Sequence, residues 1–137
     1  MIITPGEALV ALSLWIDAGN AHRDPEAVTW GRIAKVSEEC GEVIAAYIGA
    51  TGQNPRKGVV GSLKVEVVEE LLDVAVTALG AIEHVTGHHG YALARLDDKI
   101  MRVAVRAGVL DQRRNERYDA VLDGPDESTE GDVDRDR

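Results

Sequence analysis

The sequence has few features that would cross-link the chain or anchor it in a membrane. Its 137 residues include a single cysteine, Cys40, which cannot form an internal disulfide, so a reducing cytoplasm is the expected location. No apolar run approaches the roughly 18 residues that a membrane span needs. The first residues also lack the charged start of a signal peptide. We therefore expect no membrane partner.

Basic residues are also scarce. Lys and Arg number 15 against 24 Asp and Glu, a net charge of −9, and such a chain is not expected to bind nucleic acid. The imbalance is uneven, because residues 111–137 hold ten acidic and five basic residues and so supply −5 of the −9. Large apolar side chains are rare in the last part of this segment. The sequence predicts one helical domain over residues 1–110 and an acidic, disordered tail over 111–137.

Strand-like alternation is missing, whereas four segments repeat apolar residues at helical spacing. Three of them follow a capping residue, and two have proline at the first helical position. The predicted helices span residues 5–19, 25–50, 63–85 and 90–107, and the caps are Thr4, Asp24 and Ser62. The expected fold class is all-α, a four-helix bundle.

The third predicted helix, Leu63 to Val85, is apolar almost all the way round, which is typical of a buried helix. It nevertheless carries Glu66, Glu70 and Asp73 at positions i, i+4 and i+7, on one stripe. Two unit charges ~4 Å apart repel by about 4 kcal/mol at an effective dielectric near 20. A buried stripe of this kind needs a cation.

The second predicted helix carries a matching pair, Glu39 and Glu42, at i and i+3. Cys40, between them, is expected to face the core. Two such pairs on neighbouring helices can bring four carboxylates to one site. Ligation by oxygen alone suits hard cations such as Mg²⁺ or Mn²⁺ rather than zinc or copper.

Glu38-Glu39-x-x-Glu42, followed after 27 residues by Glu70-x-x-Asp73, resembles the EExxE…ExxD signature of the MazG-like, all-α nucleoside triphosphate pyrophosphohydrolases. The resemblance covers about residues 5–108. It implies that Glu39, Glu42, Glu70 and Asp73 bind Mg²⁺ and that a (deoxy)nucleoside triphosphate is hydrolysed to the monophosphate and pyrophosphate. It also implies a homodimer or a pair of dimers. Glu38, beside the implied ligands, is the candidate general base, and a solvated glutamate is the alternative.

A triphosphate substrate needs cations from the protein. Lys99 and Arg102, on a basic stripe of the fourth helix, are candidates, and so is Lys57 with its neighbour Arg56 in the loop between the two acidic helices. The alternatives are an exposed loop and a solvated basic face, or salt bridges to Glu66 and Glu69. For the base we expect Trp30, with Trp15, Asn20 and His22; core packing is the alternative for both tryptophans.

Two other classes of protein compete with this prediction. A ferritin-like di-iron bundle requires Glu-x-x-His, and none of the four histidines has a glutamate three residues before it. A non-catalytic helical interaction protein of the same fold stays open as the alternative. His84, His88 and His89 are close in sequence, but Gly87 and Gly90 put the last two in a turn, so a histidine metal site is not favoured.

Overall fold

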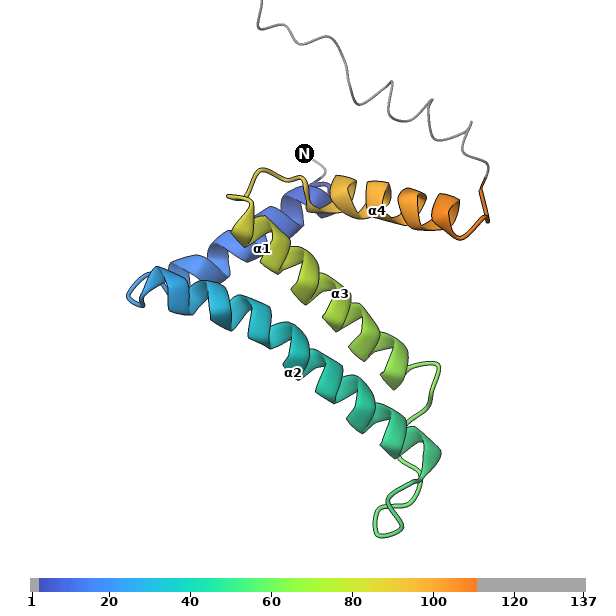
Figure 1. Ribbon diagram of the computed structural model, residues 1–137. Coiled ribbons are helices and arrows are strands. Elements are labelled where there is room, and N and C mark those ends of the chain that lie inside the picture. Colours follow the sequence, from blue (N-terminus) through green and yellow to red (C-terminus); the bar gives the residue numbers. More distant parts are fainter. Residues whose placement is uncertain (1–2, 111–137) are drawn as a thin grey trace, which may run out of the picture. The chain divides into compact units, whose positions relative to one another are not determined.

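The computed structural model describes residues 3–110, which form four α-helices and contain no strand. The helices are α1 (Pro5–Gly19), α2 (Pro25–Thr51), α3 (Glu66–Val85) and α4 (Ala92–Arg106) (Figure 1). The predicted all-α class with four helices is confirmed. None of these helices combines the length and the apolar character that a bilayer crossing requires. The predicted acidic tail lies outside the described residues.

The described chain divides into two compact units, and the boundary in the sequence lies between Arg95 and Leu96. In the first unit, α2 and α3 lie side by side and run antiparallel, and α1 packs against α3 (Figure 1). The second unit contains most of α4 and the residues that follow it up to 110. The candidate metal ligands all belong to the first unit.

The starts of α1 and α2 follow the capping signals of the sequence. The Glu7 N–H donates to Thr4 Oγ1 at 3.2 Å, and the Thr4 N–H donates to Glu7 Oε2 at 2.8 Å, which completes a capping box. Asp24 Oδ1 accepts the Ala27 N–H at 3.0 Å. Gly52 ends α2 in the left-handed region, at φ 65°.

The two later helices begin inside their predicted bounds. Residues 63–65 form a turn, and Ser62 Oγ accepts the Val65 N–H at 3.2 Å, so α3 begins at Glu66 rather than Leu63. The α4 helix begins at Ala92 rather than near Gly90. The carboxylate of Glu83, which is buried, accepts the Gly90 N–H at 2.9 Å and the Ala92 N–H at 2.7 Å. A buried side chain from α3 therefore fixes where α4 starts.

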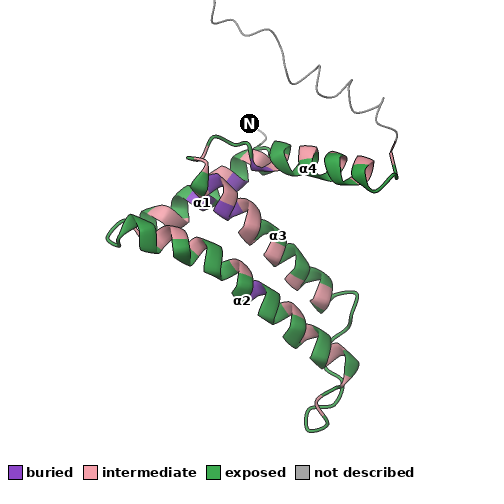
Figure 2. Ribbon diagram, viewed as in Figure 1, coloured by how far each residue is buried: buried purple, intermediate pink, exposed green. Residues whose placement is uncertain are grey.

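The prediction that the third helix is buried is wrong within the described residues. Val68 is 43% exposed, and Leu71 and Leu72 are each 52% exposed. The buried positions of α3 are confined to its last part, at Gly80, Ala81 and Glu83 (Figure 2). Cys40 on α2 is also exposed instead of facing a core. The reason is that α1, with 15 residues, and α2 cover only part of the apolar surface of α3.

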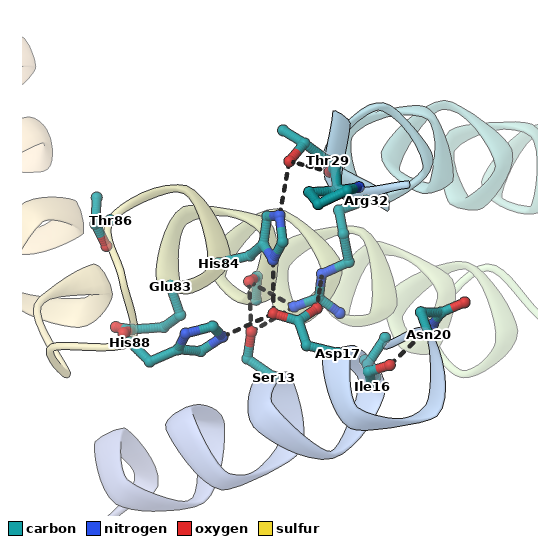
Figure 3. Close-up of polar contacts among 12 residues, drawn as sticks. Ser13, Ile16, Asp17, Asn20, Thr29, Arg32, Glu83, His84, Thr86 and His88 are labelled. Carbon is teal, nitrogen blue, oxygen red and sulfur yellow. Dashed lines mark hydrogen bonds and ion pairs between the residues drawn. The ribbon is translucent and has the colours of Figure 1, made fainter. Parts of the chain in front are cut away.

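A polar contact joins the three helices where α3 is buried. Ser13 on α1 is almost completely buried, and its Oγ donates to the carbonyl oxygen of Gly80 at 3.0 Å. Arg32 on α2 donates from Nη2 to the same carbonyl at 2.7 Å and to Ser13 Oγ (Figure 3). Because buried polar groups are costly without partners, this contact fixes the position of α1 on the α2–α3 pair.

Candidate metal and nucleotide site

Three predicted metal ligands come together between α2 and α3. One carboxylate oxygen from each of Glu39, Glu70 and Asp73 lies within 4.8 Å of the others. Glu39 is buried, Glu70 is half-buried and Asp73 is exposed. The i, i+3 spacing on α3 and the antiparallel packing of α2 against α3 place them there. We call these three residues the carboxylate cluster.

The fourth predicted ligand, Glu42, lies at the edge of this cluster. The negative charge of Glu39 raises the pKa of the Glu42 carboxyl, and partial desolvation and the charge of Glu70 raise it further. Glu42 therefore lies close enough to Glu39 and Glu70 for their charges to change its pKa, although it is not a member of the carboxylate cluster. A cation at the cluster would relieve this repulsion.

Lys35, which was not among the residues predicted from the sequence, neutralises part of the cluster. Its Nζ lies 2.6 Å from Glu38 Oε2 and 2.8 Å from Glu39 Oε1. These two contacts, with Glu38 first, raise the pKa of the Lys35 ammonium well above its ordinary value. The spacing of Lys35 from the two glutamates, i+3 and i+4 on one helix, was the signal available in the sequence.

Glu38, the candidate general base, points to Lys35 rather than into the cluster. Its side chain is more than half exposed, at 58%. It is adjacent in sequence to Glu39, which does belong to the cluster, but neighbouring residues of an α-helix point roughly 100° apart. Glu38 itself is not one of the three clustered residues. Its role as a base stays a prediction.

Lys57 shares a hollow with two of the predicted ligands. The loop after α2 folds back on that helix, because the Val60 N–H donates to the Gly49 carbonyl oxygen at 2.9 Å. The hollow has a volume of about 750 Å³, and its lining includes Glu42, Glu70 and Lys57. Arg56 does not line it. The loop thus brings the predicted phosphate-binding lysine to the side of the acidic site.

The other predicted phosphate-binding residues lie in the second unit. Arg102 pairs with Asp98, one turn before it on α4. Lys99 is exposed. Phosphate binding by Lys99 and Arg102 stays a prediction.

The aromatic residues expected at a base pocket are on the surface. Trp30 is 64% exposed and Trp15 is 72% exposed, so neither packs in the core. A second hollow, of about 400 Å³, lies between α1, α2 and α3, and Trp30 does not line it. Its lining is mostly apolar and includes Asn20, which was expected at the pocket, and three cations that were not: Arg23, Arg32 and Lys35.

A second group of potential metal ligands contains two histidines that the sequence did not favour as metal ligands, together with Asp17, which was not considered. His84 and His88 meet Asp17 of α1, and each of the three offers an atom within 4.8 Å of the others. His89, grouped with the other two histidines by sequence, lies against Tyr91 instead. Asp17 is 67 residues from His84, and no local pattern connects them.

In comparisons with known proteins, no family model, no curated protein and no solved structure matches this chain.

Proposed function

We propose that this protein is a Mg²⁺-dependent nucleoside triphosphate pyrophosphohydrolase of the MazG-like type. The observation that carries the proposal is the carboxylate cluster, in which Glu39, Glu70 and Asp73 bring three oxygens within 4.8 Å of one another from two antiparallel helices. One of the three is buried, and three carboxylates this close repel unless a cation joins them.

The donor set fits the proposed ion. Mg²⁺ takes oxygen ligands at roughly 2.0–2.1 Å, so the oxygens around one ion lie a few ångströms apart. The oxygens of Glu39, Glu70 and Asp73 lie within 4.8 Å of one another, so small side-chain movements bring them to this spacing. Glu42 would add a fourth oxygen ligand if it turned inward. The set contains no imidazole or thiolate, which favours Mg²⁺, with Mn²⁺ as a substitute, over zinc or copper.

In the proposed reaction a water molecule attacks the α-phosphorus. The new bond joins the water oxygen to that phosphorus, the bond to the oxygen bridging the α- and β-phosphates breaks, and its electron pair leaves with pyrophosphate. When bound, Mg²⁺ would neutralise phosphate oxygens and make water more acidic. Glu38 is the residue proposed to take the proton of the attacking water. Its contact with Lys35 must open for this step.

The two hollows suggest how the substrate is held. Lys57 lines the larger one beside Glu42 and Glu70 and would bind phosphate oxygens. Phosphate binding by Lys99 and Arg102, which lie in the second unit, stays a separate part of the proposal. The smaller hollow is apolar, has a volume in the range of small-molecule pockets and adjoins the cluster through Lys35. We assign it to the nucleoside. Trp30 does not line this hollow, so its proposed contact with the base is a separate prediction.

The exposed apolar stripes support a homodimeric assembly. Ile33 and Ile44 lie on one stripe of α2 and are 46% and 60% exposed, and α3 exposes Val68 and Leu72. A helical pair that exposes such stripes lacks a partner. A second copy of the α2–α3 pair would complete a four-helix arrangement and bury both stripes. The homodimer, or a pair of dimers, is therefore part of the proposal.

The decisive experiment is a panel of ribo- and deoxyribonucleoside triphosphates incubated with the full chain and Mg²⁺, with pyrophosphate and monophosphate measured together. We expect equal amounts of both products and no orthophosphate. Glu70→Gln should abolish turnover, whereas the neighbouring Glu69→Gln should leave it unchanged. If no triphosphate is turned over with Mg²⁺ or Mn²⁺, the enzyme proposal fails and the non-catalytic interaction protein becomes the better explanation.

A further inference from the structure

Asp17, His84 and His88 form a second group of ligand atoms that the proposed reaction does not use. They come from α1, from α3 and from the loop after α3, and their side chains turn toward one another (Figure 3). Asp17 Oδ2 lies 2.6 Å from His84 Nδ1 and 3.0 Å from His88 Nε2. All three side chains are mostly buried, with 16% to 21% exposed.

The hydrogen bonds of Thr29 determine which nitrogen of His84 carries a proton. The Thr29 hydroxyl has one hydrogen and donates it to the Pro25 carbonyl oxygen at 3.0 Å. It must therefore accept from His84 Nε2, which lies 2.9 Å away. In a neutral imidazole with its proton on Nε2, Nδ1 presents a lone pair to the carboxylate of Asp17. Two acceptors 2.6 Å apart repel, so this pair requires either a second proton on Nδ1 or a cation that binds both atoms from one side.

His88 is held toward Asp17 in a backbone conformation that costs energy. Its φ of 61° is the one positive value outside glycine within residues 3–110. The loop is nevertheless fixed, because the His88 N–H donates to the Glu83 carbonyl oxygen at 2.7 Å and the Glu83 carboxylate accepts two N–H groups farther along. His88 Nε2 is buried without a hydrogen-bond partner. A strained residue that aims an unsatisfied nitrogen at a carboxylate indicates a site.

Arg32 decides which kind of cation suits this site. Its Nε lies 3.7 Å from Asp17 Oδ1, and Nη2 is tied to Ser13 and Gly80. The charge of Asp17 is therefore already partly balanced, which works against hard cations such as Mg²⁺ or Ca²⁺ that are held mainly by negative charge. An ion that gains its affinity from imidazole nitrogens is less affected.

We propose that Asp17, His84 and His88 bind a transition-metal ion of the zinc class. Asp17 Oδ2, His84 Nδ1 and His88 Nε2 are the ligands. Two further residues orient these ligands. Thr29 accepts a hydrogen bond from Nε2 of His84, and Arg32 lies next to Oδ1 of Asp17. Metal ligands in proteins usually have such hydrogen-bonding or charged neighbours. The ion would tie α1 to the end of α3 and to the loop that follows.

Calorimetric titration of the full, metal-stripped chain with Zn²⁺ tests the site, with saturating Mg²⁺ present to occupy the carboxylate cluster. We expect one Zn²⁺ per chain. His88→Asn, which tolerates the positive φ, should weaken Zn²⁺ binding at least tenfold, and the matched His89→Asn should not change it. Equal Zn²⁺ binding by His88→Asn, or none by the unaltered chain, would overturn the proposal.

Nitrogen-detected NMR of the imidazoles tests the same site without altering a ligand. The chain has four histidines, and variants of the exposed His22 and His89 assign those two by loss of signal. On Zn²⁺ addition the signals of His84 and His88 should shift and those of His22 and His89 should stay. If His84 carries protons on both nitrogens and no signal moves with Zn²⁺, the carboxylate of Asp17 is balanced by an imidazolium, and the metal site is refuted.

Discussion

Lys35 Nζ lies 2.8 Å from Glu39 Oε1, which makes a lysine the immediate partner of the one buried residue in the carboxylate cluster. The same nitrogen contacts Glu38 at 2.6 Å. A metal ion that binds Glu39 must therefore compete with this ammonium group, unless Lys35 turns toward the substrate phosphates.

Lys35→Met should bind Mg²⁺ more tightly than the unaltered chain. Removing a unit charge about 4 Å from the ion changes the interaction by about 1 kcal/mol in a water-like dielectric, or about fivefold in affinity. The metal-free variant should also melt at a lower temperature, because the buried Glu39 loses its partner. Calorimetry with Mg²⁺ measures the first effect. Lys64→Met, at an exposed lysine, is the control, and equal or weaker affinity in Lys35→Met would show that the ammonium does not compete.

Glu70→Gln and Asp73→Asn should leave the metal-free chain equally or more stable, because each removes one of three repelling charges. Mg²⁺ that binds only the folded state raises the melting temperature of the unaltered chain in proportion to ln(1 + [Mg²⁺]/Kd). Both variants should lose most of this rise. Glu69→Gln should keep it in full. Thermal melts with and without Mg²⁺ decide the matter, and unfolding of both variants would identify the cluster as a structural network.

The raised pKa of Glu42 predicts that Glu42→Gln increases the thermal stability of the metal-free chain by an amount that depends on pH. In the folded state the pKa of the Glu42 carboxyl lies above its ordinary value of 4.5. The charge of ionised Glu42 therefore lowers the free energy of unfolding at neutral pH, and this loss of stability disappears as the pH falls through the folded-state pKa. The metal-free variant should melt higher than the unaltered chain at pH 7, and the difference should shrink by pH ~4.

Glu7→Gln is a control for that experiment, because it should change the melting temperature in the opposite direction. The Thr4 N–H and hydroxyl lower the pKa of the Glu7 carboxyl. Ionised Glu7 therefore stabilises the folded state above pH 4.5, and this stabilisation is lost as the pH falls through the folded-state pKa. Glu7→Gln should therefore melt lower than the unaltered chain at pH 7. The same sign of change in both variants would argue against the charge repulsion at Glu42.

Lys57→Ala and Lys99→Ala should each lower kcat/KM at least tenfold with the fold intact, which corresponds to about 1.4 kcal/mol of transition-state binding. The physical reason is the loss of a positive charge near the triphosphate. Lys64→Ala is the matched control and should retain full activity. Steady-state kinetics of the three variants separate the loop lysine from the α4 lysine, and normal kinetics for both Lys99→Ala and Arg102→Ala would reduce the α4 stripe to a solvated face.

Leu72→Lys should convert a dimer into a monomer, since it places a charge on an exposed apolar stripe of α3. Val59→Lys, at a loop residue that is 71% exposed, should leave the assembly unchanged. Light scattering after size-exclusion chromatography measures both. A monomeric unaltered chain at micromolar concentration would contradict the proposed assembly.

The helices of this chain, and the spacing of its carboxylates, follow from the sequence because both are short-range properties. Thr4 and Asp24 fix the starts of α1 and α2 through hydrogen bonds to residues three positions away. The i, i+3 spacing of Glu70 and Asp73 puts both carboxylates on one side of any regular helix. Glu39 joins them, as the double motif suggested.

Tertiary structure alone decided which surfaces are covered and which distant side chains meet. An apolar period on α3 predicts burial but does not say how much of the helix a short α1 and a single α2 can cover, and Leu71 and Leu72 are left half exposed. Asp17 reaches His84 across 67 residues because Ser13 and Arg32 fix α1 against Gly80. Such a contact depends on the rotation and crossing of packed helices, which side chains far apart in the sequence determine together.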